Sequence, residues 1–273
     1  SPKADSQAPP THVGGAVVRR VLLEDLTGPR CPNCPLAGEI ADGIQNFYNT
    51  DEERVIVVDV NMVAQFSAPE PPNYTTDFRT PAGDAYEQTF GIAAIGLPRG
   101  LVNRMPYQGA LALNKNNWSS AVAQVVDLPA DMDVWFDNFN FNSSTNVVTT
   151  TVKVAVLNPV AGPHNLTVYL TEDHVIDWQV DGRLPTGQQD IPDYDHRHVL
   201  RDNLNGTWGD VIIPTSAQAG DTLSESFTYT LPPAGAINHV LNTSNCSLVA
   251  YVYSTAGADQ YEVKQAAERK FTP

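Results

Sequence analysis

The chain has 273 residues, of which 42% are hydrophobic and 17% charged, and 31 acidic against 16 basic residues give a formal net charge of −15. Its length is about 1.8 times that of a typical 150-residue domain, which predicts two domains. The acidity excludes a nucleic-acid backbone or an anionic membrane surface as the main partner. The longest apolar runs are much shorter than the ~20 residues of a transmembrane helix.

Residues 1–15 repeat Pro, Ser and Ala and lack the charged-then-apolar pattern of a signal peptide, which predicts a flexible tether. A tether at a mature N-terminus favours an exported protein and would suit a lipid anchor upstream of Ser1. A trimmed cytosolic chain would look the same, so both interpretations stay open, with export favoured.

Residues 16–128 alternate between strand-like and helix-like patterns. Continuous apolar runs indicate buried strands, and apolar residues spaced three or four apart indicate helices. The expected elements, in chain order, are a strand at 16–26, a helix at 36–48, a central strand at 54–61, a helix from Pro81 to Gly91, a strand from Leu101 and a helix at 117–126 with Asn117 as its N-cap. This order predicts an α/β sandwich with helices on both sides of a sheet.

Residues 129–273 have a different texture, with short segments rich in Val, Thr, Tyr and Phe between turn clusters. The clearest of the six or seven expected strands are 134–141, 147–156, 165–171, 224–231, 246–254 and 261–271. Without a convincing helix among them, they predict an immunoglobulin-like antiparallel β-sandwich. The expected fold class is therefore α/β followed by all-β.

The three cysteines cannot all pair, which excludes a disulfide-stapled scaffold. Cys31 and Cys34 form a Cys-Pro-Asn-Cys motif between the first strand and the first helix. The partial positive charge at a helix start favours a thiolate, and Arg30 could add to it, so we expect Cys31 to face solvent and Cys34 to lie just inside. Cys246 lies in an apolar strand and is expected to be an inert buried thiol.

The strand–CxxC–helix unit resembles a thioredoxin-fold domain, and Ile95-Gly-Leu-Pro98 is similar to the segment of that family that ends in a cis-proline. The resemblance implies that Pro98 lies opposite Cys31, with the backbone near Leu97 free to pair with an extended substrate. It also implies a buried acid six residues before the first cysteine, which is Asp25 here. A buried carboxyl has a raised pKa and can carry a proton.

Several features depart from the thioredoxin pattern. Arg30 replaces an aromatic residue, Pro32-Asn33 replaces Gly-Pro, and a long insert follows Asn61. These departures put the usual reductase role in doubt. Glu24 stays an alternative to Asp25 as the acid near the second cysteine, because neighbouring side chains on a strand point to opposite faces of the sheet.

The resemblance narrows to the outer-membrane protein Omp28 family. The similar segments span the chain from Val17 to about Phe271 and are 21–35, 96–104, 198–201, 205–209 and 265–268. The family implies a thioredoxin-like domain followed by a β-sandwich, in an exported protein that is periplasmic or associated with the outer membrane and in many cases is a lipoprotein. It implies no firm biochemical activity.

These observations lead to two competing functions, neither of which requires a cofactor. In the first, Cys31 is the attacking thiolate of a thiol–disulfide exchange, Cys34 the resolving thiol, Asp25 the proton carrier and Pro98 one wall of the substrate groove. The β-sandwich then positions this site, and the partners are client thiols and disulfides or another envelope protein. In the second, a non-enzymatic surface binding or adhesion protein uses the CxxC only as a structural disulfide.

A metal site is a further, weaker hypothesis. In an extended segment, His196 and His198 would point to the same face, where Asp193 or His174 could complete a metal shell. The simpler interpretation is that these polar residues line the junction between the domains. Zinc at the CxxC would need four ligands, and no second pair of ligands accompanies this one.

Overall fold

The computed structural model describes residues 15–237 and 240–272 and shows an α/β part followed by a β-rich part. This coarse fold class is the one that the sequence predicts. The predicted tether, apart from Gly15, lies outside the described residues. Within the described ranges, no helix is both long and apolar enough to cross a membrane.

The first part of the chain contains the predicted alternation of strands and helices. Its elements are β1 (Val21–Thr27), α1 (Cys34–Tyr48), β2 (Val55–Asn61), α2 (Ala64–Ser67), α3 (Pro81–Phe90), α4 (Ile92–Ile95), β3 (Arg99–Val102), the 3-10 turn η1 (Lys115–Asn117) and α5 (Trp118–Val125). As predicted, α3 ends at Gly91, which adopts a left-handed conformation (φ 67°) that favours glycine. Asn117 precedes α5, but its side chain makes no capping hydrogen bond.

The second part contains more strands than the sequence predicts. Its elements are β4 (Met132–Asn142), β5 (Val147–Val156), β6 (Val160–Ala161), β7 (His164–Glu172), β8 (Val175–Val180), β9 (Asp190–His196), β10 (Val199–Asn203), β11 (Asp210–Ile213), β12 (Ser216–Ala217), β13 (Thr222–Thr230), α6 (Ala234–Ile237), the 3-10 turn η2 (Thr243–Asn245), β14 (Cys246–Ser254) and β15 (Val263–Lys270). The six expected strands correspond to β4, β5, β7, β13, β14 and β15.

One sheet joins both parts of the chain. Its strands lie in the order β15-β14-β7-β10-β2-β1-β3, and β11 also pairs with β7. β2 runs parallel to β1, with Asp25 opposite Asp59, and β10 joins the other side of β2, where Val199 lies opposite Asp59. Strands on both sides of the predicted boundary at 128/129 therefore share a sheet, and the division into two domains stays a prediction.

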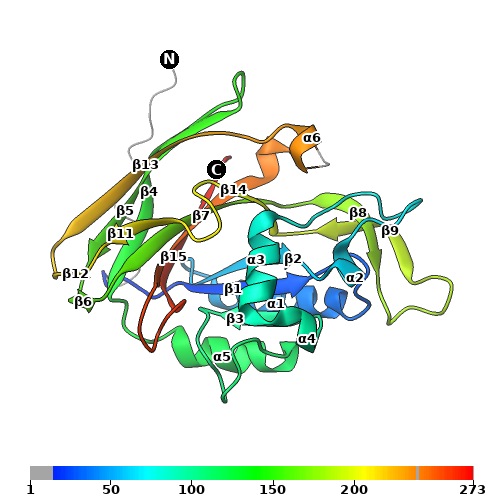
Figure 1. Ribbon diagram of the computed structural model, residues 1–273, viewed down its shortest axis with the longest axis horizontal. Coiled ribbons are helices and arrows are strands. Elements are labelled where there is room, and N and C mark those ends of the chain that lie inside the picture. Colours follow the sequence, from blue (N-terminus) through cyan, green and yellow to red (C-terminus); the bar gives the residue numbers. More distant parts are fainter. Residues whose placement is uncertain (1–14, 238–239, 273) are drawn as a thin grey trace.

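Helices and a second sheet cover the two faces of this sheet (Figure 1), because its side chains alternate between the faces and both faces are apolar. One face packs against α3 and α4. The opposite face packs against α1 and α5 in the first part of the chain, and against the three-stranded sheet β13-β5-β4 in the second. Trp118 of α5 lies so close to Gly100 that a Cβ at Gly100 would overlap the indole ring.

β8 and β9 form a two-stranded sheet of their own. Residues 181–189 connect them into a hairpin, which lies at one end of the molecule beside α2 (Figure 1). Most of its side chains are exposed or half-buried; Val175, Gln179 and His196 are the buried exceptions in the two strands. The sequence analysis did not predict this hairpin.

Candidate functional site

Cys31 and Cys34 are joined by a disulfide at the start of α1. The turn that leads into the helix is held by its own backbone, because Cys31 N–H donates to the carbonyl of Gly28 (3.0 Å) and Cys34 N–H donates to that of Cys31 (3.2 Å). Pro35 follows at a first-turn position, where a missing N–H costs no helical hydrogen bond. The strand–CxxC–helix unit is therefore present as predicted.

The expected exposure of the first sulfur is wrong. Cys31 is 1% exposed and Cys34 3%, although Pro32 and Asn33 between them are exposed. On one side the turn receives the side chain of Gln179, whose Nε2 lies 3.3 Å from the carbonyl oxygen of Cys31. This cover could not be predicted from the sequence around the CxxC, because Gln179 follows Cys31 by 148 residues.

Arg30 does not add an unpaired positive charge beside the disulfide. Its guanidinium forms an ion pair with Glu70 and also donates to the carbonyl oxygen of Ala64. Arg30 is therefore already paired, whereas the partial positive charge at the start of α1 still favours a thiolate at this turn.

Asp25 is buried on the face of β1 that packs against α1. Val21 and Leu23 pack against α1, so the alternation of β1 places Asp25 on the same face, toward the helix that begins at Cys34. Neither carboxylate oxygen has a hydrogen-bond partner among the described residues. Burial, and then the charge of Asp42, raises the pKa of Asp25 well above its ordinary value.

A second carboxyl group accompanies Asp25. Asp59 lies opposite it on β2, and burial together with the neighbouring Asp25 raises the pKa of Asp59 well above its usual range. Asp59 also lines a cavity of about 300 Å³ between α1, β2 and residues 194–198, together with Asp42 and His198. The sequence signal for Asp59 was a single acid that interrupts the apolar run of β2.

His198 supplies a positive charge at this cavity. Its Nε2 lies 3.2 Å from Asp42 Oδ1, and its Nδ1 lies 3.3 Å from Asp173 Oδ1. Although burial lowers the pKa, the hydrogen bond to Asp42 and the charges of Asp173 and Asp59 raise the pKa of His198 to about 9. His198 is therefore charged at neutral pH and partly compensates the surrounding carboxyl groups.

The predicted pairing of His196 with His198 at a metal is not present. His196 ends β9, and Nε2 of its ring lies 3.2 Å from the carbonyl oxygen of Trp178. His198 has a positive φ of 52°, so the backbone is not extended between the two residues and their rings do not share a face. In the described ranges, no group of three or more His, Cys, Asp or Glu side chains could hold a metal ion.

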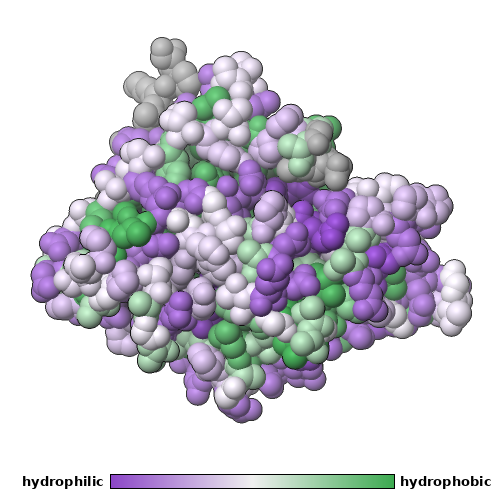
Figure 2. Space-filling model, in the orientation of Figure 1, coloured by the Kyte–Doolittle hydropathy of each residue, from purple (hydrophilic) through white to green (hydrophobic). Residues whose placement is uncertain are grey.

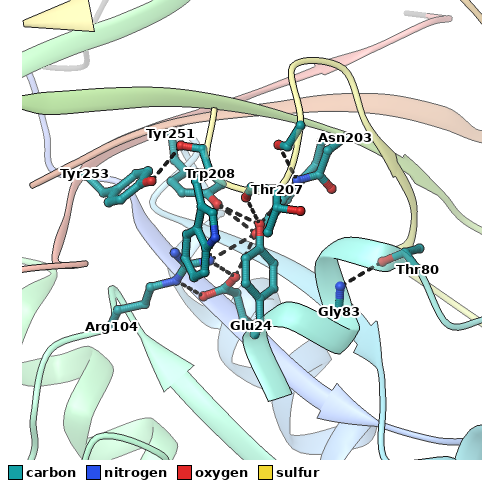
Figure 3. Close-up of polar contacts among 12 residues, drawn as sticks. Glu24, Thr80, Gly83, Arg104, Asn203, Thr207, Trp208, Tyr251 and Tyr253 are labelled. Carbon is teal, nitrogen blue, oxygen red and sulfur yellow. Dashed lines mark hydrogen bonds and ion pairs between the residues drawn. The ribbon is translucent and has the colours of Figure 1, made fainter. Parts of the chain in front are cut away.

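Glu24 belongs to a different site from Asp25. It lies on the opposite face of β1, where it is buried and accepts two hydrogen bonds from Arg104, at 2.8 and 2.7 Å. The hydroxyl groups of Tyr169 and Tyr251 complete the contacts of this ion pair. Figure 3 shows Arg104 and Glu24 facing each other beside Trp208 and Tyr251. Glu24 therefore does not serve as the proton carrier behind the disulfide.

The Arg104–Glu24 pair joins the two parts of the chain. Arg104 follows β3 and Glu24 lies on β1, whereas Tyr169 and Tyr251 lie on β7 and β14. Aromatic rings surround the guanidinium, with Tyr86 and Tyr251 at 4.8 and 5.2 Å from its central carbon. Segments 96–104 and 205–209, which carried the family resemblance, thus meet at this cluster through Arg104 and Trp208.

The structure also describes Pro98, which the resemblance singled out, and Cys246, which was expected to be an inert buried thiol. The Leu97–Pro98 peptide bond is cis. Because Arg99 lies opposite Leu26 in the register of β3 with β1, Pro98 is at the same end of the sheet as the CxxC turn. Cys246 is buried, and its desolvation raises the pKa of its thiol to about 12, so it is inert as a thiolate near neutral pH.

The fold and this site define a β-rich α/β protein with a CxxC disulfide at the start of α1 and a buried carboxyl group on the face of β1 toward that helix. The profile of the family described as Outer membrane protein Omp28 matches residues 83–270. The chain belongs to the Omp28 family, as the sequence resemblance predicted, and it is a protein of the cell envelope associated with the outer membrane. The matched region begins after Cys34, so the family assignment does not rest on the disulfide.

Two solved structures with TM-scores above 0.5 support the fold. HBP35 of Porphyromonas gingivalis is similar with a TM-score of 0.66 and 19% identity, over 93% of this chain and 76% of that chain. A protein of Agrobacterium tumefaciens is similar with a TM-score of 0.56 and 11% identity, over 94% and 96% of the two chains. A domain of the outer membrane lipoprotein Omp28 from P. gingivalis is 23% identical over 54% of this chain and 93% of that one, with a TM-score of 0.33. No curated protein matches the chain.

Proposed function

We propose that this envelope protein carries out thiol–disulfide exchange at Cys31 and Cys34, in a thioredoxin-like first part of the chain. The observation that supports this most strongly is the buried carboxyl group of Asp25, which has no partner and faces the helix that begins at Cys34. A buried polar group without a partner costs about 1–3 kcal/mol. A disulfide that only closed a turn would gain nothing from it, whereas a departing thiolate needs a proton donor.

The disulfide form acts as an oxidant. A client thiolate attacks Sγ of Cys31, so a mixed disulfide forms, the Cys31–Cys34 bond breaks and Cys34 leaves as a thiolate. Asp25, whose pKa is raised by burial, gives its proton to Cys34. A second client thiolate then attacks the client sulfur of the mixed disulfide and displaces Cys31. The client gains one disulfide and the protein takes up two electrons; the reverse steps reduce a client disulfide.

The second part of the chain, residues 129–273, is proposed to be an immunoglobulin-like sandwich that positions this site or binds an envelope partner. Its support is the packing of β13-β5-β4 over β7, β14 and β15 around one apolar core. The buried Arg104–Glu24 pair, with Tyr169 and Tyr251 around it, then holds the two parts in a fixed relation.

The exchange reaction is tested with variants that stop it halfway. In Cys34→Ser, the free Cys31 thiolate should attack a disulfide-bonded peptide and retain one half of it as a mixed disulfide, which mass spectrometry detects. Cys31→Ser is the matched control, because it keeps Cys34 and Cys246, and it should form no adduct. Equal labelling of the two variants, or none in either, would rule out Cys31 as the attacking sulfur.

A second candidate is a non-enzymatic binding protein in which the disulfide is structural, and the burial of both sulfurs favours it. Closing a loop of four residues stabilises a fold by about 2 kcal/mol in the chain-entropy model. The double variant Cys31→Ala/Cys34→Ala should then lose this stability and nothing else. Such binding could use exposed large apolar residues. These come from separate elements and include Phe47, Ile176 and Val211. The face of the molecule shown in Figure 2 is mainly hydrophilic.

A further inference from the structure

The β8–β9 hairpin is bonded to the CxxC turn through its backbone. Val180 N–H donates to the carbonyl oxygen of Pro29 (2.8 Å), and Gly182 N–H donates to that of Pro32 (2.9 Å). These two N–H groups are two residues apart, which is the spacing at which an extended strand presents donors to one side. Segment 180–182 thus binds the turn as an added strand would.

The contact between Gly182 and the turn leaves no room for a side chain. A Cβ at Gly182 would lie 2.9 Å from Cβ of Pro32 and 3.2 Å from its carbonyl oxygen. The backbone at this glycine is not in the left-handed region, so proximity to Pro32 is what excludes a larger residue. A strand that binds this turn therefore needs a small residue opposite Pro32.

Side-chain contacts with the loop at 74–78 also hold the hairpin: Thr76 donates to Asp177 (2.5 Å), Tyr74 donates to Asp190, and the ring of Phe78 lies beside that of His196. The hairpin forms a separate two-stranded sheet, and in the described part of the chain Val175, at its base, is its one member of a buried apolar cluster, with Phe78 and Val199. Arg183 pairs with Glu39 at 2.8 and 2.7 Å, but both side chains are exposed and such pairs contribute little. Two-stranded hairpins are marginal on their own, so this one can open without unfolding the core.

We propose that the surface beneath segment 180–182 is the binding surface for an extended client polypeptide, and that the hairpin occupies it until a client displaces it. This inference rests on the exchange function proposed above and adds the class of partner. The carbonyl groups of Pro29 and Pro32 bind the client backbone, a small client residue lies opposite Pro32, and Cys31 becomes accessible only when the hairpin has left. Client binding and access to the disulfide are thus one event.

Access is tested by the rate at which a water-soluble phosphine reduces the Cys31–Cys34 disulfide. Gly182→Ala forces the hairpin off the turn, so reduction should be about tenfold faster or more, because two backbone hydrogen bonds that keep the cover closed are lost. Gly43→Ala is the matched control, since a Cβ there meets nothing within 4 Å, and it should leave the rate unchanged. Equal rates in Gly182→Ala and the wild type would overturn the role of the hairpin as a cover.

Hydrogen exchange of the wild-type protein keeps the test independent of the variant's folding. The amides of Val180 and Gly182 should exchange through a local opening that low denaturant concentrations do not accelerate. Exchange of these amides only together with those of β14 would show that the hairpin opens only by global unfolding, and would contradict the proposal.

The client surface is tested with a fluorescent peptide that copies residues 176–184. It should bind Gly182→Ala, whose surface is vacant, and the same peptide with Val in place of its glycine should not. Absence of binding by the copied peptide would overturn the client surface. Neither the reduction assay nor the peptide-binding assay requires thiol–disulfide exchange. A Cys34→Ser variant that traps no adduct would therefore contradict the exchange function alone. The reduction rate and the peptide binding would still test whether the hairpin is a cover and whether the surface beneath it binds a client.

Discussion

At the scale of single residues, the described site contains two neighbouring carboxyl groups, of which Asp25 is buried and Asp59 half-buried at the wall of a cavity. Asp25 and Asp59 lie opposite each other on β1 and β2, and burial raises the pKa of both. The positive charge of His198 lowers the pKa of Asp59 in part.

The raised pKa of Asp25 makes the stability of the protein depend on pH. A carboxyl group whose pKa is higher in the folded state contributes stability that is fully present below its unfolded value, near 4, and that is lost as the pH rises through the folded value. The free energy of unfolding should therefore fall above pH 4 by up to about 1.4 kcal/mol per pH unit because of this group. Asp25→Asn should flatten that fall in urea titrations between pH 4 and 7.

The exposed Asp51 provides the control for this prediction. Asp51→Asn should keep the wild-type dependence on pH. Asp25→Asn should in addition slow the reduction of the disulfide by client thiols, because Cys34 then leaves without its proton donor. An unchanged pH dependence in Asp25→Asn would show that Asp25 is ionised in the folded protein and cannot donate.

His198 is a base and not an acid, but its raised pKa should also make the stability of the protein fall as the pH rises. Because its pKa is raised to about 9, it contributes stability that is present below pH 6.5 and lost as the pH rises to about 9. That interval corresponds to about 3 kcal/mol at most. His198→Gln should be less stable than the wild type at pH 6 and close to it at pH 9.5, measured by denaturant unfolding. His174→Gln, at an exposed ring, should show no such convergence.

At the scale of elements, the close approach of α5 to β3 depends on Gly100. Trp118 occupies the space of a Cβ at that position, so Gly100→Ala must shift the helix. Overpacking of this kind costs about 1–3 kcal/mol. We expect that loss in chemical denaturation, with faster hydrogen exchange in α5, whereas Gly43→Ala on α1 should be neutral or slightly stabilising. Wild-type stability in Gly100→Ala would mean that the indole can move aside at no cost.

The elements also show how far the sequence could predict this fold. Periodicity located α1, and the apolar run of β2 predicted a central strand, because those patterns reflect burial on one or both faces. The helix α3 was located by its end residues, Pro81 and Gly91. The hairpin was not predictable, since β8 and β9 bury few side chains and their contacts with the CxxC turn are made by backbone atoms. The same contacts explain why the expected exposure of Cys31 was wrong.

At the scale of the whole molecule, the two parts of the chain meet on one sheet and around one buried ion pair. The partner of Glu24 is 80 residues away, at Arg104, and the surrounding tyrosines come from β7 and β14. No local pattern encodes such a pairing, so the sequence predicted a buried acid at Asp25 but left the role of Glu24 open.

Removing one partner of this pair should destabilise the whole fold. Arg104→Met leaves the charge of Glu24 buried, which typically costs about 3–5 kcal/mol. The double variant Glu24→Gln/Arg104→Met should recover part of that loss in denaturant unfolding. Arg54→Met, which breaks an exposed pair with Asp127, should cost less than about 1 kcal/mol. A small effect of Arg104→Met would show that the cluster does not hold the two parts together.

The reduction potential of the Cys31–Cys34 pair, measured by equilibration with thiol–disulfide buffers and mass spectrometry of the trapped species, tests the exchange function most directly. Structural disulfides in exported proteins typically lie below about −300 mV, whereas disulfides that take part in exchange have higher potentials. We predict a value clearly above about −300 mV, with the pair fully reversible. A value well below it would contradict exchange and leave the disulfide a structural link at the start of α1.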